Sequence, residues 1–174
     1  MTLVEQWPDY LIERARQAPP EGCGIVTGAT PVVSFGDPVN PAVATLGINP
    51  SSAEFLGSDG GLLAGTQRRL ATLASLGVSD YGDVDAALGS VIVDECASYF
   101  GRQPYRWFRP LDQILREGAG VSYFEGSACS LDLVQWATSP VWGGLDESVR
   151  ARLLAEDEPF LVRQLRRSTT GWSS

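Results

Sequence analysis

Apolar residues recur along the chain with two periods, one typical of helices and one typical of buried strands. A spacing near 3.6 residues predicts helices at residues 3–16, 66–76, about 83–100, 107–116, 146–155 and 158–166. Short apolar runs bounded by glycine and proline predict strands at residues 24–27, 31–35, 43–48 and 128–136. The first two runs flank Gly28-Ala29-Thr30, which indicates a hairpin or an edge feature.

Strand patterns that alternate with helical patterns indicate an α/β fold. We expect a three-layer α/β/α sandwich with a mainly parallel central sheet. The chain has 174 residues, of which 44% are hydrophobic, so it is long enough to bury the core of one domain. We therefore predict a single domain over residues 1–174, in which residues 168–174 form a polar tail.

The charge balance is acidic, with 13 Lys and Arg against 21 Asp and Glu and a net charge of -8. Tight non-specific binding to a polyanion normally needs a basic surface, so this balance argues against such binding. It does not exclude a local basic face. The chain contains no apolar run long enough to span a bilayer, and its first residues lack the basic and apolar segments of a secretory signal. We expect a cytoplasmic protein that does not bind a membrane.

The chain contains no histidine, which removes the usual serine and cysteine triads and most catalytic zinc sites. Its three cysteines, Cys23, Cys96 and Cys129, lie far apart and form no Cys-x-x-Cys pair. Buried, reduced thiols are the simplest interpretation. We therefore expect neither a metal site nor a cofactor.

The strand predicted at residues 43–48 stops abruptly in Asn49-Pro50-Ser51. Pro50 lacks an amide donor and disfavours helical geometry at Asn49, so the asparagine side chain should project beyond the carboxyl end of the strand. In open α/β sheets, ligands bind at that edge. Ser51 and Glu54 have the spacing of a capping box for a following helical turn. Alternatively, Asn49 only bonds its own backbone in a simple turn.

The strand predicted at residues 128–136 carries Asp132 within an apolar run. An acid at the end of a buried strand either contacts a ligand or is solvated, or it caps a neighbouring helix.

Two segments in order resemble the uracil-DNA glycosylase superfamily. Thr45-Leu46-Gly47-Ile48-Asn49-Pro50-Ser51 is similar to its first motif, in the Gly-Ile-Asn-Pro form of the mismatch-specific uracil/thymine glycosylases. The segment Leu131-Asp132-Leu133-Val134-Gln135-Trp136-Ala137-Thr138 is similar to the Thr-Asp-Leu-Val-x-Arg-x-Thr segment of the same branch. The resemblance covers most of residues 31–142.

This resemblance implies excision of uracil or a related damaged base from DNA, by hydrolysis of the N-glycosidic bond after the base is flipped into a pocket. Asn49 would position the attacking water, and backbone amides near Gly47, Ile48 and Ser51 would face a carbonyl of the base. Phe55 is the first candidate for stacking on the base, and Tyr105 or Phe108 is the second. The implied substrate-binding residues are Gly47, Ile48, Pro50, Ser51, Phe55 and Asp132.

The chain also departs from the family pattern. No His-Pro-Ser or Asn-Pro-Ser turn follows Trp142, although the superfamily carries its second catalytic motif there. We therefore expect a truncated sheet that lacks its last strand and exposes an edge, where a partner or a second copy could bind. The alternative function is a non-catalytic glycosylase-like scaffold, acting as a binding or vestigial module.

Overall fold

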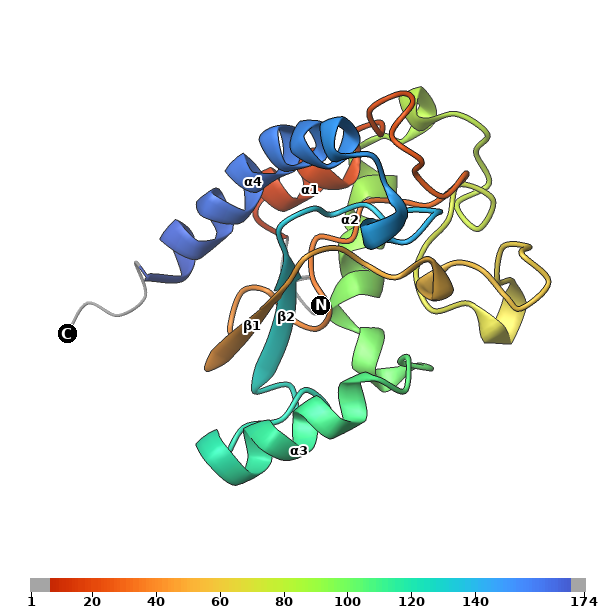
Figure 1. Cartoon of the computed structure of the whole chain (residues 1–174). Helices are drawn as coiled ribbons and strands as arrows, with labels where there is room; N and C mark the ends of the chain where they lie inside the picture. The colour runs from red at the N-terminus through yellow and green to blue at the C-terminus, as the bar shows by residue number, and fades with distance from the viewer. Residues whose placement is uncertain (1–6, 170–174) are drawn as a thin grey trace.

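The computed structural model describes residues 7–169 (Figure 1). Its helices and strands are α1 (Asp9–Ala15), β1 (Val43–Gly47), α2 (Ala86–Ala97), α3 (Phe108–Ala119), β2 (Ala128–Asp132) and α4 (Glu147–Thr169). Within residues 7–169, five short 3-10 helices, η1 to η5, lie in the connections, beginning with η1 (Ser52–Glu54). Residues 3–6 of the first predicted helix and residues 170–174 of the predicted polar tail lie outside the described residues.

The two strands form a parallel pair whose register runs from Val43 opposite Ala128 to Gly47 opposite Asp132. They lie side by side at the centre of Figure 1, with α1 and α4 at one end and α3 at the other. Helices combined with a parallel sheet confirm the α/β class. Among residues 7–169 the sheet has two strands, so the structure does not confirm the expected three-layer sandwich.

The side chains of β2 alternate between two environments, as a strand requires. Ala128 belongs to the main hydrophobic core, which also contains residues of α1, α2 and the segment 26–35. On the other face, Cys129 and Leu131 pack against Leu161 of α4. All five residues of β2 are buried, because this strand is covered on both faces.

β1 differs from the prediction, which treated its apolar run as a buried strand. Leu46 is 59% exposed, and Ile48, just after the strand, is 50% exposed. Leu46 is paired with Leu131, yet α4 covers the β2 side of this face and leaves β1 open. Apolar content predicted the strand, but it could not predict which strand of the pair α4 would cover.

The two helices predicted at residues 146–155 and 158–166 are one helix, α4, which continues through Pro159. Its buried residues, Leu153, Asp157, Leu161 and Gln164, recur at intervals of three and four residues and so form one stripe. Packing along this stripe outweighs the hydrogen bond that Pro159 cannot make.

The helix predicted at residues 66–76 is wrong, because residues 70–77 form turns and a β-bridge. Thr72 and Ser75 exchange hydrogen bonds between their side chains and backbone amides, and such bonds compete with helix formation. The backbone amide of Leu73 donates to the carbonyl of Gly28 instead of to a helical partner. Leu70 and Leu73 are nevertheless buried in the core.

The hairpin predicted from the runs at residues 24–27 and 31–35 is also absent from the described chain. Ile25 forms an isolated bridge with Thr138, and Phe35 forms one with Ser130 of β2. Each run therefore contacts the segment around β2 rather than its neighbour in sequence.

Two other predicted helices are confirmed with adjusted ends. Asp85 caps α2 by accepting a hydrogen bond from the amide of Leu88 at 2.9 Å. α3 ends at Ala119 and is followed by Gly120, whose positive φ of 66° gives the left-handed geometry typical of a helix C-terminus. Among residues 7–169, no helix is both long enough and apolar enough to cross a membrane.

Candidate functional site

The carboxyl ends of β1 and β2 bring the two sequence motifs together. Gly47 ends β1 and pairs with Asp132, which ends β2. The register continues past the strands, because the carbonyls of Gly47 and Ile48 accept hydrogen bonds from Leu133 and Val134 at 3.1 and 2.9 Å. The turn that carries Asn49 therefore lies beside Asp132 at the edge of the sheet where ligands of α/β proteins bind.

Glycine at position 47 makes room for the Asp132 side chain. A Cβ atom built on Gly47 would lie far inside van der Waals contact with Oδ1 of Asp132. The carboxyl group thus occupies the space above the backbone of Gly47. Any side chain at position 47 would displace it.

Asn49 is held in one orientation by the segment that follows β2. Its Nδ2 donates to the backbone carbonyl of Trp136 and to Oγ1 of Thr138, both at 3.2 Å. The carbonyl of Trp136 can only accept, so the donor must be the amide nitrogen. Within residues 7–169, Oδ1 of Asn49 makes no hydrogen bond, which leaves it as an acceptor for a ligand or a water molecule.

The predicted capping box is only half correct. Ser51 caps η1, because its Oγ accepts a hydrogen bond from the amide of Ala53 at 3.2 Å. Glu54 turns into the protein instead, and its Oε2 accepts a hydrogen bond from the Tyr99 hydroxyl at 2.6 Å. The Tyr99 oxygen in turn accepts from the amide of Tyr105 at 2.8 Å, which fixes its proton toward Glu54.

The electrostatics of Glu54 and Asp132 are unusual for carboxyl groups. Burial raises the pKa of Glu54 to about 7, although the Tyr99 hydrogen bond and the charge of Arg69 favour its ionised form. Burial raises the pKa of Asp132 to about 7 as well, and the negative charge of Glu54 adds to this shift. Burial and the neighbouring charge of Glu54 also raise the pKa of Tyr99.

These residues line a cavity of about 180 Å³. Its lining consists of Phe35, Asn49, Pro50, Ser51, Glu54, Tyr105, Trp107, Ser130 and Asp132. A cavity of about 150 Å³ can hold benzene, and pockets for drug-sized ligands begin near 300 Å³. The cavity therefore has room for a ligand of about one ring, with aromatic surfaces and polar groups to contact it.

The structure places four of the predicted site residues in this cavity, namely Asn49, Pro50, Ser51 and Asp132. Gly47 and Ile48 do not line it, because Gly47 lies under Asp132 and the Ile48 side chain is exposed.

The expected stacking role of Phe55 is not supported by its position, since Phe55 is only 1% exposed and packs in the main core. Of the second candidates for stacking, Tyr105 lines the cavity. Phe108 is buried among Phe35, Tyr99, Phe100 and Tyr123.

Four cavity residues were missed by the sequence analysis: Phe35, Glu54, Trp107 and Ser130. Glu54 was assigned to a cap because the spacing from Ser51 fits that motif. The sequence pattern places Trp107 only at the start of the helix predicted at residues 107–116, and the structure leaves it 51% exposed at the cavity. Phe35 and Ser130 reach the site through their bridge, and their mutual backbone hydrogen bonds of 2.8 and 2.9 Å have no local sequence signal.

Other groups of potentially reactive side chains in the described chain show neither a metal site nor a reactive thiol. Among residues 7–169, no group of three or more His, Cys, Asp or Glu side chains could hold a metal ion. Cys23, Cys96 and Cys129 are buried and not disulfide-bonded. Burial raises the pKa of Cys96 and of Cys129 to about 12, so both thiols stay protonated at neutral pH.

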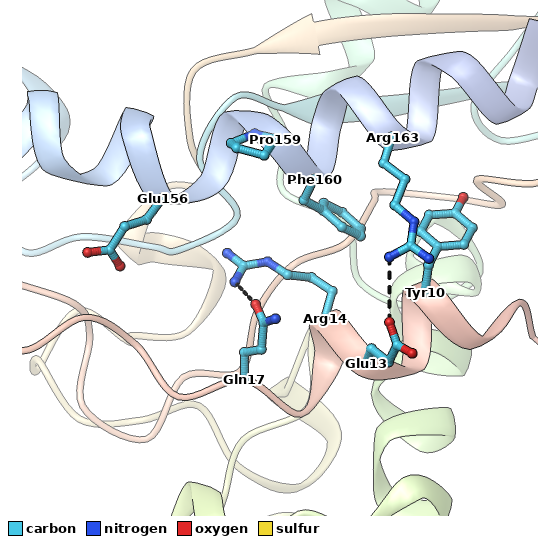
Figure 2. A pocket seen from close by; sticks show the side chains of 8 residues that line it. All are labelled: Tyr10, Glu13, Arg14, Gln17, Glu156, Pro159, Phe160 and Arg163. Carbon is cyan, nitrogen blue, oxygen red and sulfur yellow. Dashed lines mark hydrogen bonds and ion pairs between the residues drawn. The ribbon is translucent and has the colours of Figure 1, made fainter.

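A second hollow of about 260 Å³ lies between α1 and α4 (Figure 2). Its charged groups have partners: Arg163 approaches Glu13 at 3.5 Å, as Figure 2 shows. Arg14 forms an ion pair at 2.8 Å with Asp157, which is buried and does not line the hollow. Burial lowers the pKa of Arg14, and the charge of Asp157 opposes that shift. These contacts hold α1 against α4, and they leave this hollow with fewer groups for chemistry than the cavity at the strand ends.

Comparisons of the chain with protein-family models, with curated proteins and with solved structures gave no match.

Proposed function

We propose that the protein is a DNA-base N-glycosidase of the uracil-DNA glycosylase type, which excises uracil or a related damaged base. The observation that carries the proposal is the position of Asn49 and Asp132, which come from two separate sequence motifs and line one cavity of about 180 Å³. In this proposal the parallel pair is the centre of a three-layer α/β/α sandwich that lacks its last strand.

Asn49 is the residue that would position the attacking water. Its Nδ2 is engaged by Trp136 and Thr138, so its Oδ1 is available to accept a hydrogen bond from water. An amide cannot ionise at neutral pH, so its contribution is orientation rather than proton transfer.

The aromatic side chains at the cavity support binding of a flat base. Phe35, Tyr105 and Trp107 line it, and stacking on aromatic rings is a general way to hold an unpaired base. The half-exposed Trp107 lies between the exposed residues Arg106 and Arg109 in sequence. Arginines beside an aromatic residue at the mouth of a pocket would contact phosphates of DNA locally, despite the acidic charge of the whole chain.

The test is base release from duplexes that carry uracil opposite guanine, measured with the purified protein and with Asn49→Ala. We expect release by the unmodified protein and a loss of at least tenfold in the variant. Asn40→Ala is a matched control, because Asn40 also precedes a proline but is exposed and outside the cavity. Equal rates for the unmodified protein and Asn49→Ala would remove the assignment.

A second candidate function is a non-catalytic scaffold that binds a ligand in the same cavity. Two buried carboxyl groups in an acidic protein favour it, because they oppose the approach of a polyanion. Cooperative unfolding without base release from any duplex would support this candidate. Release that depends on Asn49 would contradict it.

A further inference from the structure

Asp132 is a carboxyl group without a protein partner inside the cavity. Its residue is 8% exposed, and within residues 7–169 its side chain forms no hydrogen bond or ion pair. Burial of such a group without a partner costs free energy. Glu54, which is 1% exposed, lines the same cavity but is held by Tyr99. A ligand that fills the cavity therefore meets one fixed and one unsatisfied carboxyl group.

Two carboxyl groups disfavour a base that leaves as an anion. When the bond between uracil and the sugar breaks, the electron pair stays on the base and gives it a negative charge. An ionised carboxylate in a cavity of low dielectric constant repels that charge. A base that receives a proton as it leaves avoids the repulsion.

We propose that Glu54 and Asp132 form a carboxyl pair that selects a pyrimidine with an exocyclic amine, cytosine or a derivative, and protonates it as it leaves. This inference rests on the proposed glycosidase function: uracil is still released, but more slowly, and cytosine or a derivative is the base that the same cavity prefers. Single-ring bases fit the volume of about 180 Å³ better than purines do.

The hydrogen-bonding groups of cytosine complement a pair that holds one proton. The amine of cytosine offers two N–H donors, and its ring nitrogen N3 accepts a proton from a carboxylic acid. Uracil presents one N–H donor between two carbonyl oxygens on the same edge. It therefore leaves a carboxylate facing an oxygen, which costs binding free energy.

The proposed reaction balances without a cofactor. The bond between C1′ of the sugar and N1 of the base breaks, and its electron pair goes to the base. The protonated carboxyl group gives its proton to N3 of the base, which departs as neutral cytosine. Water held by Asn49 forms the new bond to C1′ and loses a proton to a carboxylate, so the pair again holds one proton.

The charged and titratable groups around the pair set its pH dependence. Glu54 faces the Tyr99 hydroxyl and the charge of Arg69, and Asp132 faces Glu54. Because burial raises the pKa of both carboxyls to about 7, the pair retains a proton at neutral pH and loses it above that. The rate of base release should therefore fall as the pH rises from 7 to 9.

The experiment compares duplexes of one sequence that carry cytosine, uracil or adenine opposite an abasic-site analogue. The base is then unpaired in every duplex, so the energy of breaking a base pair does not bias the result. Single-turnover release is measured from pH 5 to 9 for the unmodified protein, Asp132→Asn and Glu54→Gln. Thermal unfolding confirms that each variant is folded.

We expect cytosine to be released at least tenfold faster than uracil at pH 6, with a fall above pH 7. Asp132→Asn should lose this preference and flatten the fall, because an amide cannot supply the proton. Release of uracil or adenine at least as fast as cytosine, with no change across this pH range, would overturn the inference and leave the glycosidase function standing.

If no base is released from any duplex, the proposed function fails, and a second measurement then decides the inference. Free cytosine and free uracil are titrated into the protein at pH 6 and followed by NMR. Cytosine binding at least tenfold tighter than uracil, and weakened tenfold by Asp132→Asn, would support selection by the carboxyl pair. Equal or absent binding would overturn it.

Discussion

At the scale of single residues, the site depends on the relation between Gly47 and Asp132. The glycine has no Cβ, and the carboxyl group of Asp132 fills the space a Cβ would need. The two strand ends approach each other closely, which requires glycine at position 47. The same close approach buries the carboxyl group of Asp132. A carboxyl group buried in this way changes the stability of the protein with pH, because its pKa differs between the folded and unfolded states.

We compare the free energy of unfolding of Asp132→Asn with that of the unmodified protein. The variant minus the unmodified protein should give a larger value at pH 8 than at pH 5. The pKa of Asp132 is about 7 in the folded state and near 3.8 otherwise, so the folded state holds the proton more tightly. The stability contributed by this proton is present below pH 4 and is lost as the pH rises through 7. We expect the effect of Asp132→Asn on the free energy of unfolding to differ by on the order of 2 kcal/mol between pH 5 and pH 8.

Urea unfolding at pH 5 and pH 8 measures this difference. Ser130→Ala is the control, because it alters the wall of the same cavity without removing an ionisable group. Its effect on the free energy of unfolding should be equal at the two pH values. A pH-independent effect of Asp132→Asn would show that the carboxyl group is not buried as described.

The sequence predicted some of these residues and missed others for physical reasons. Asn49 was found because it follows a predicted strand, and Asp132 because it is an acid within an apolar run. Glu54 was assigned to a cap because spacing alone cannot show whether a carboxylate folds back to the backbone or turns toward Tyr99. Phe55 was expected at the site but packs in the core, whereas Trp107, for which no role at the site was predicted, lines the cavity. An aromatic residue near a turn can do either, and the local sequence does not distinguish the two.

At the scale of secondary-structure elements, local pattern and tertiary packing disagree most at α4 and at residues 66–76. Pro159 indicated a boundary between two helices, but one buried stripe from Leu153 to Gln164 holds a single helix together. At residues 66–76 the leucine spacing indicated a helix, but the bonds between Thr72 and Ser75 favour turns. The sequence could not rank these competing contributions, because part of the decision lies far away along the chain, as in the carbonyl of Gly28 that accepts from the amide of Leu73.

Pro159→Ala should stabilise the protein. The proline lies inside α4, where it lacks a donor and its ring crowds the preceding turn. Alanine would restore the hydrogen bond at an exposed position and raise the free energy of unfolding by about 1 to 3 kcal/mol. Thermal and urea unfolding measure the change.

Pro110→Ala is the matched control for this prediction. Pro110 is also exposed, but it lies in the first turn of α3, where the backbone amide has no partner within the helix. Its replacement should change the free energy of unfolding by less than about 0.5 kcal/mol. Equal effects of the two substitutions would show that the proline in α4 adds no strain.

At the scale of the whole molecule, the parallel pair is covered unevenly. All residues of β2 are buried, whereas Leu46 of β1 and Ile48, just after β1, are exposed. Among residues 7–169, β1 pairs with β2 and with no other strand, so its outer edge is unpaired. An unpaired edge next to exposed apolar residues can pair with another chain.

We predict that the protein associates with itself through this edge as its concentration rises. Leu46→Lys should weaken the association at least tenfold, because a charge on an edge strand opposes pairing between chains. Sedimentation velocity at several concentrations measures the dissociation constant. Ile114→Lys provides the control, since Ile114 is 64% exposed but belongs to α3 and to neither strand. A monomer at all concentrations, or equal weakening by both substitutions, would contradict an interface at β1.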